Sequence, residues 1–259
     1  MLAACIIAFA MYSRIPMLRV DWSRENMRYV LCFFPLVGAA VGGIYYLAAC
    51  FLVSPEVSKI AAAAVLTVIP ILVTGGIHMD GFLDTIDARR SYAPKEKKLE
   101  ILKDPNSGAF AVIYACVWFL LYYAAQAQLL EAGCGRMRLF GAVAAGFVYS
   151  RALSGFAAVS FKGAKKSGLL ASFSDGAQKR TVRIVTAGFA VAAAAAMTAL
   201  QPFAGAAAAA AGLVVFFYYR WMAYREFDGI TGDLAGYFVQ VCELAIGITA
   251  VIAGSTAGI

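Results

Sequence analysis

The sequence has little charge and few of the side chains that usually carry polar catalysis. Only 14% of its 259 residues are Asp, Glu, Lys or Arg, whereas soluble domains carry roughly a quarter. It contains a single histidine, and no Walker A motif, nucleophile elbow or metalloprotease helix occurs. These absences argue against an ordinary soluble domain, against P-loop ATP hydrolysis and against the usual serine hydrolysis.

The cysteines offer neither a disulfide framework nor a metal site. They lie mostly inside apolar runs and lack the paired spacing of metal ligands, so we interpret them as small core residues. The six are Cys5, Cys32, Cys50, Cys116, Cys134 and Cys242. The first apolar stretch has no basic residues before it and no evident cleavage site, so a cleaved signal peptide is not expected.

Long apolar runs dominate what is present, at 62% hydrophobic residues. They do not alternate as barrel strands do, so the sequence predicts an all-α, polytopic transmembrane helical bundle. We expect about seven spans plus a short N-terminal helix, forming one integral-membrane domain over 1–259. The short helix covers 1–12, and the spans lie at about 29–53, 59–79, 108–130, 138–160, 184–200, 203–222 and 234–253.

The basic residues predict the orientation of these spans. The connecting segments 13–28, 80–107, 161–183 and 220–233 hold four, six, six and two of the 22 lysines and arginines. Basic loops favour the cytoplasmic side of a membrane. We therefore expect the protein in the cell inner membrane, with these four segments in the cytoplasm. The net charge of +7 is then a feature of cytoplasmic loops, and no nucleic acid partner is expected.

The stretch GGIHMDGFLDTIDARR, residues 75–90, carries the most chemistry. In a helix, offsets of four and three residues place Asp80, Asp84 and Asp87 on one stripe. Like charges on one stripe destabilise a bare helix, and carboxylates are ligands that Mg²⁺ prefers. The alternative is a solvated face paired with Arg89 or downstream lysines, but such a face does not need the glycines around it. We therefore favour a Mg²⁺ site.

His78 lies on roughly the opposite helix face from Asp80. A lone histidine is more often a packing residue than a ligand, so two interpretations stay open. It either packs, or it acts as a catalytic residue that orients a loop or contacts substrate.

Several basic residues are candidates for phosphate binding. Arg89 and Arg90 directly follow the acidic stripe, and the arginine fork suits phosphate. Lys165 and Lys166 lie among glycines in FKGAKKSG. For each of them, contact with anionic lipid is the alternative.

Two acidic residues near the starts of apolar runs allow two interpretations. Asp104 in DPNSG could cap the next helix, with Pro105 at its first position, and Asp233 could cap the last span. Both are also candidate metal ligands beside the acidic stripe.

Arg151 and Glu243 lie within apolar spans, where charge is costly and usually faces a partner or a wet cavity. We interpret them as candidate substrate contacts that could pair with each other, joined by Gln240 one turn from Glu243.

These motifs together resemble one known family. GGIHMDGFLDTIDA followed by KLEILKDPNSGAFAV resembles the signature of the adenosylcobinamide-GDP ribazoletransferases, the cobalamin synthases. SRIPM, FFPLVGAAVGG, YSRALSGFAAVSFKGAKKSGLLASF and GITGDLAGYFVQVCEL resemble the family's other segments, in order and over nearly the whole chain. The middle segment departs most, at Lys165 and Lys166.

The resemblance implies a Mg²⁺-dependent membrane enzyme. Its substrates would be adenosylcobinamide-GDP and α-ribazole or α-ribazole 5′-phosphate, and its products the cobamide (or its phosphate) and GMP. Ions on Asp80, Asp84 and Asp87 would bridge the pyrophosphate, and Asp84 or Asp87 would accept the proton of the attacking hydroxyl.

The remaining candidates have supporting roles in that scheme. Arg89, Lys165 and Lys166 would bind the guanosine diphosphate, and Asp104 and Asp233 would add metal or hydroxyl contacts. The lower base and the oligomeric state, including a homo-oligomer, stay open. The alternatives are a CDP-alcohol phosphatidyltransferase-like enzyme, whose aspartates are spaced differently, and a cation-coupled transporter, whose acids usually lie at the midplane.

Overall fold

The computed structural model describes residues 1–54, 56–131, 137–164 and 176–256, and the described part is built from helices and contains no strand. This confirms the all-α prediction. Between these helices, one isolated parallel bridge joins Gly163 and Ile230. The helices are α1 (Leu2–Tyr12), α2 (Arg24–Met27), α3 (Val30–Leu52), α4 (Lys59–Thr74), α5 (Ile77–Arg90), α6 (Lys95–Ile101), α7 (Ala109–Glu131), α8 (Met137–Ser160), α10 (Lys179–Leu200), α11 (Pro202–Phe227) and α12 (Gly232–Thr256).

Six of the described helices are long and apolar enough to cross a membrane, namely α3, α7, α8, α10, α11 and α12. α4 and α5 pass the same test only as a pair, bent by 93° at their junction. The expected count of about seven spans is therefore reached when the bent pair is one broken span. The chain is a multi-pass membrane protein, and its short first helix packs on α3.

The bend between α4 and α5 differs from the uninterrupted run expected over 59–79. Gly75 ends α4 with φ +66°, and Gly76 precedes α5 with φ +79°. Two successive left-handed residues turn the helix path by 93°, and glycine adopts that conformation without a steric cost. The side chain of Arg14 covers this turn, because a Cβ on Gly75 would lie 2.6 Å from its Nε. The paired glycines therefore set the direction of the acidic stripe.

Small residues let the helices approach closely. A Cβ on Gly38 of α3 would lie 2.3 Å from the carbonyl oxygen of Phe147 in α8. A Cβ on Gly81 of α5 would lie 2.7 Å from the carbonyl oxygen of Asp233 in α12. In lipid, where apolar surface gives little drive for association, such close packing holds helices together.

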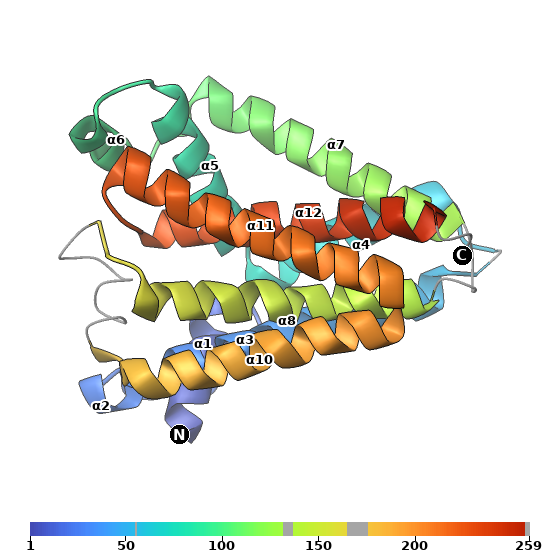
Figure 1. The fold of residues 1–259 in the computed structure, drawn as a ribbon, viewed down its shortest axis with the longest axis horizontal. Coiled ribbons are helices and arrows are strands. Elements are labelled where there is room, and N and C mark those ends of the chain that lie inside the picture. Colours follow the sequence, from blue (N-terminus) through green and yellow to red (C-terminus); the bar gives the residue numbers. More distant parts are fainter. Residues whose placement is uncertain (55, 132–136, 165–175, 257–259) are drawn as a thin grey trace.

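The charged segments gather at one end of the bundle, as the basic residues predict (Figure 1). α2, α6, the end of α8 and the connection between α11 and α12 all lie there. The C-terminus and the connection between α10 and α11 lie at the other end.

Candidate active site

The acidic stripe lies where α5 meets the starts of two spans. Gly81 packs on the backbone of Asp233 in the first turn of α12. One turn further along α12, Gly236 packs on the backbone of His78. Asp87, at the other end of the stripe, reaches the start of α7. α5 thus joins α7 and α12 at their charged ends, and this crossing brings Asp233 to the stripe.

Four carboxylates are electrostatically coupled at this crossing. Asp84 is half-buried, and Asp80, Asp233 and Asp87 all act on its charge. Within the described ranges, neither Asp80 nor Asp84 has a hydrogen bond or an ion pair to its carboxylate. The charges of Asp80 and Asp84, which repel each other and have no such partner in the described structure, favour a bound cation.

Asp87 differs from the other members of the stripe because its carboxylate is already occupied. It accepts hydrogen bonds from the backbone N–H groups of Gly108 and Ala111, at the N-terminus of α7. The first N–H groups of a helix have no partner within it, and the positive end of the helix dipole favours an anion there. The N-terminus of α7 thus compensates part of the negative charge of the stripe, at Asp87.

The remaining carboxylates could hold a metal ion with help from a ligand. In the described part of the chain, no group of three or more His, Cys, Asp or Glu side chains is arranged so that it could hold a metal ion by itself. Mg²⁺ does not require such a set, because it usually takes one or two carboxylates together with waters and substrate phosphates. Asp80, Asp84 and Asp233 supply oxygen donors of that kind.

His78 is buried at 4% exposure and makes no hydrogen bond in the described structure through either ring nitrogen. Its ring stacks on Tyr12 of α1 and Phe34 of α3, with centroids 6.1 and 5.7 Å away. The stacking matches the packing interpretation. The two ring nitrogens without hydrogen-bond partners are not explained by packing, because an unsatisfied buried polar group costs about 1–3 kcal/mol.

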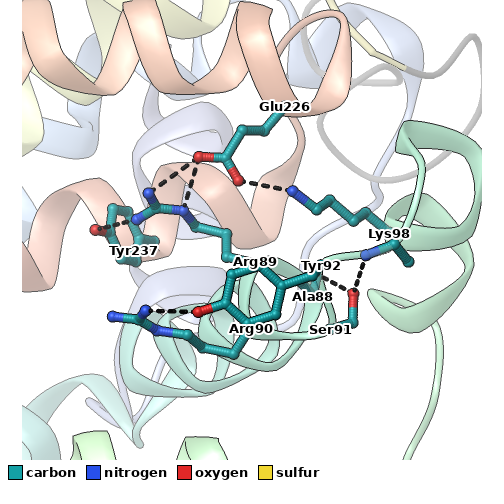
Figure 2. A network of polar contacts seen from close by, with 9 residues as sticks. Ala88, Arg89, Arg90, Ser91, Tyr92, Lys98, Glu226 and Tyr237 are labelled. Carbon is teal, nitrogen blue, oxygen red and sulfur yellow. Dashed lines mark hydrogen bonds and ion pairs between the residues drawn. The ribbon is translucent and has the colours of Figure 1, made fainter.

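Arg89 is engaged by protein groups (Figure 2). Its Nε and Nη2 donate to Oε1 of Glu226 in the last turn of α11, at 3.2 and 3.0 Å. Its Nη1 donates to the hydroxyl of Tyr237 in α12 at 3.0 Å. Lys98 of α6 donates to the other carboxylate oxygen of Glu226 at 2.8 Å. This cluster ties four helices together, and we call it the Glu226 clamp.

Arg90 has a different environment from its neighbour. Its guanidinium donates to the hydroxyl groups of Tyr92 and Tyr114 and lies 4.7 Å from the centroid of the Tyr114 ring. Among the described residues, no carboxylate pairs with it.

The sequence allowed Asp104 to cap α7 and Asp233 to cap α12, and both interpretations are wrong. α7 begins at Ala109 rather than at Pro105, and its free N–H groups meet Asp87. Asp104 is exposed, and two hydrogen bonds from Asn106 hold the pKa of its carboxyl below its usual range. At α12 the hydroxyl of Thr231 caps the helix by accepting the N–H of Leu234, at 3.2 Å. Asp233 follows this cap in the first turn of α12, and its Oδ2 accepts a hydrogen bond from the same hydroxyl at 3.3 Å.

Arg151 and Glu243 form the expected pair, at 1% and 3% side-chain exposure. Ser150 donates a further hydrogen bond to Glu243 at 3.2 Å. The expectation for Gln240 is wrong: its side-chain oxygen is buried without a partner in the described structure, and its backbone carbonyl accepts from Trp118. The pair links α8 to α12 inside the bundle rather than at the acidic stripe.

Lys165 and Lys166 lie outside the described residues, but the chain just before them is anchored near the site. Ala164 donates its N–H to the carbonyl of Ile230, and Ile230 donates to the carbonyl of Lys162, both at 2.9 Å. Ile230 directly precedes Thr231, the cap of α12. No local sequence pattern predicts a pairing across 66 residues; the glycines at 163 and 229 are the available signal. A Cβ on Gly229 would lie 2.4 Å from the carbonyl of Lys162.

Comparison with known proteins agrees with the resemblance. The sequence profile of the family described as cobalamin-5-phosphate synthase matches residues 4–251. An adenosylcobinamide-GDP ribazoletransferase of Lachnoclostridium phytofermentans is 46% identical, over 95% of this chain and 92% of the relative. Enzymes of the same name from Geobacillus kaustophilus and Clostridium perfringens are 32% and 30% identical, over 93% and 92% of this chain and 92% of each relative. No solved structure matches the chain.

Proposed function

The chain belongs to the cobalamin-5-phosphate synthase family, and we propose that it is an adenosylcobinamide-GDP ribazoletransferase in the cytoplasmic membrane. It would join adenosylcobinamide-GDP to α-ribazole, or to its 5′-phosphate, and release GMP. The observation that carries this proposal within the structure is the crossing of α5 and α12. There α5, which carries Asp80 and Asp84, packs at Gly81 on the backbone of Asp233, and the charges of Asp80 and Asp233 both act on Asp84.

The reaction is a displacement at phosphorus. A ribose hydroxyl of the acceptor forms a new P–O bond, the bond to the GMP oxygen breaks, and the hydroxyl proton must be accepted. Such transfers depend mainly on positioning and on neutralising the charge of the phosphates. When bound, Mg²⁺ would supply that neutralisation and stabilise the leaving phosphate.

The carboxylates divide these tasks according to their partners. Asp80 and Asp233 are the metal-binding candidates that flank Asp84 on α5 and α12. Asp84 is the better candidate for the base, because the carboxylate of Asp87 is held by the N–H groups of α7. Asp87 then fixes the end of α5. Asp104 is a weaker candidate for direct metal contact than Asp80 and Asp233.

The test is transferase activity of the purified protein in lipid. Given Mg²⁺, adenosylcobinamide-GDP and α-ribazole, we expect release of GMP together with formation of a cobamide. Replacing Mg²⁺ with excess chelator should abolish the release. GMP at the level of a protein-free control, with a correctly folded sample, would contradict the proposal.

A further inference from the structure

A groove of about 320 Å³ lies on the other side of α5 from the acidic stripe. α12 lines it with Val241 and Leu244, and α7 lines it with Tyr114 and Val117. Tyr218 of α11 also contributes to the lining. Figure 1 shows α7 diverging from α12 toward the end of the bundle where α5 lies. We call this cavity the lateral groove.

The two arginines that reach the groove differ in how their charge is compensated. Arg89 is paired with Glu226 in the Glu226 clamp. Arg90 has two phenol hydroxyls and one aromatic ring as its contacts, and these carry no formal charge. A half-buried guanidinium without an anion, at the rim of a cavity, favours a negatively charged ligand.

The position of the groove favours an amphiphilic ligand over a soluble phosphate. Each helical residue turns about 100°, so Phe82 and Ile86, which line the groove, point away from Asp84. The wall away from Arg90 is built from apolar side chains of spans, with Val117 44% exposed. Val241 and Leu244 lie nine and twelve residues into α12, about 14 and 18 Å along its axis. A ligand there has a charged group at the end of the spans and an apolar part beside them.

We propose that the lateral groove binds an anionic phospholipid. The headgroup phosphate pairs with Arg90 beside the Tyr114 ring, and the first part of an acyl chain lies against Val117, Val241 and Leu244. Basic pockets between spans near a charged membrane surface are suited to such headgroups. The groove uses the face of α5 that the acidic stripe does not, so the lipid and the ligands of the stripe contact different side chains.

Native mass spectrometry of the purified protein tests the proposal. The protein is exchanged into detergent with equal amounts of phosphatidylglycerol and phosphatidylcholine that carry the same acyl chains. We expect preferential retention of phosphatidylglycerol, and Arg90→Gln should lower its retention by about fivefold, in line with the effect of one basic residue near a membrane surface. Lys97→Gln is the matched control, because Lys97 is exposed and pairs with Glu100 within α6; it should retain the lipid.

A second variant tests the apolar part without altering the charge. Val117→Trp places a larger side chain into the groove from its exposed side and should also lower retention, while size-exclusion chromatography checks that the variant is folded. Equal retention by the wild type and Arg90→Gln overturns the proposal, as does an equal loss in Lys97→Gln. Displacement of the lipid from the wild type by GMP or adenosylcobinamide-GDP would assign the groove to substrate and likewise overturn it.

Discussion

Asp84 and Asp87 are three residues apart on one helix, yet their surroundings give them different tasks. Asp87 accepts two backbone hydrogen bonds at the start of α7, whereas Asp84 faces three other acidic residues. Equal side chains therefore have unequal freedom to bind a cation or to accept a proton. Sequence spacing alone left the choice between them open.

For Asp84→Asn we expect a loss of turnover of about 10²-fold or more, the range for removing a positioned acid–base group. The measurement is GMP release by the reconstituted protein, with unfolding temperature recorded alongside. Asp21→Asn is the matched control, because Asp21 is exposed in the segment before α2. Full turnover in the Asp84 variant would remove this residue from the mechanism.

His78→Phe should separate stability from activity. Phenylalanine keeps the stacking on Tyr12 and Phe34 and removes two ring nitrogens that are buried without a partner in the described structure. We expect an unchanged or higher unfolding temperature, because the cost of unsatisfied polar atoms is removed. If a ring nitrogen contacts substrate, GMP release falls at least about tenfold, as for one lost hydrogen bond to a charged group. A variant with full turnover would assign His78 to packing.

At the scale of whole helices, the position of α5 depends on two contacts that its own sequence does not reveal. One is the glycine crossing with α12, and the other is the Glu226 clamp to α6, α11 and α12 (Figure 2). Both hold the helix that carries the acidic stripe.

Gly81→Ala should disturb the crossing. The new Cβ would lie 2.7 Å from the carbonyl oxygen of Asp233, so α5 must move away from α12, at a cost of about 1–3 kcal/mol. We expect a lower unfolding temperature and reduced GMP release. Gly43→Ala in α3 is the control, because nothing lies within 4 Å of its Cβ position. Equal behaviour of the two variants would show that the crossing tolerates a side chain.

A double-mutant cycle on Arg89→Gln and Glu226→Gln tests the clamp. Both side chains are about one-fifth exposed, so we expect a coupling energy of about 1 kcal/mol in unfolding measurements. The free energy of unfolding of the double variant should be no lower than that of the less stable single variant. The KM for adenosylcobinamide-GDP should stay nearly constant while kcat falls, because the clamp positions α5. A large rise in KM for Arg89→Gln alone would instead make Arg89 a phosphate contact.

The molecule as a whole has one end where the charged segments α2, α6 and the α11–α12 connection gather (Figure 1), and an opposite end with the connection between α10 and α11. Lys95 pairs with Asp228 across two of these segments, and this contact holds the pKa of Asp228 below its usual range. The basic excess at this end is the reason to expect it in the cytoplasm.

Cysteine labelling in intact cells tests that orientation. In a variant with all six native cysteines replaced, Lys59→Cys should react with a membrane-impermeant maleimide added outside. Lys97→Cys should react only after the cells are permeabilised. Both lysines are exposed in α4 and α6, so accessibility within the protein does not limit the reaction. The reverse pattern would place the acidic stripe outside the cytoplasm.

The sequence by itself determined the helical class, the spans other than the broken one over 59–79, and the acidic stripe, because these follow from hydropathy and from the helical period. It also predicted the Arg151–Glu243 pair, since two charges in apolar spans need each other. Only the tertiary structure decided what each candidate residue contacts. Asp87 caps α7, Arg89 pairs with Glu226, and Arg90 is left without an anion among the described residues. The partners of Asp87 and of Arg89 in Glu226 lie 21 to 137 residues away along the chain. Their proximity arises from the bend at Gly75–Gly76 and the packing of α5 against other helices.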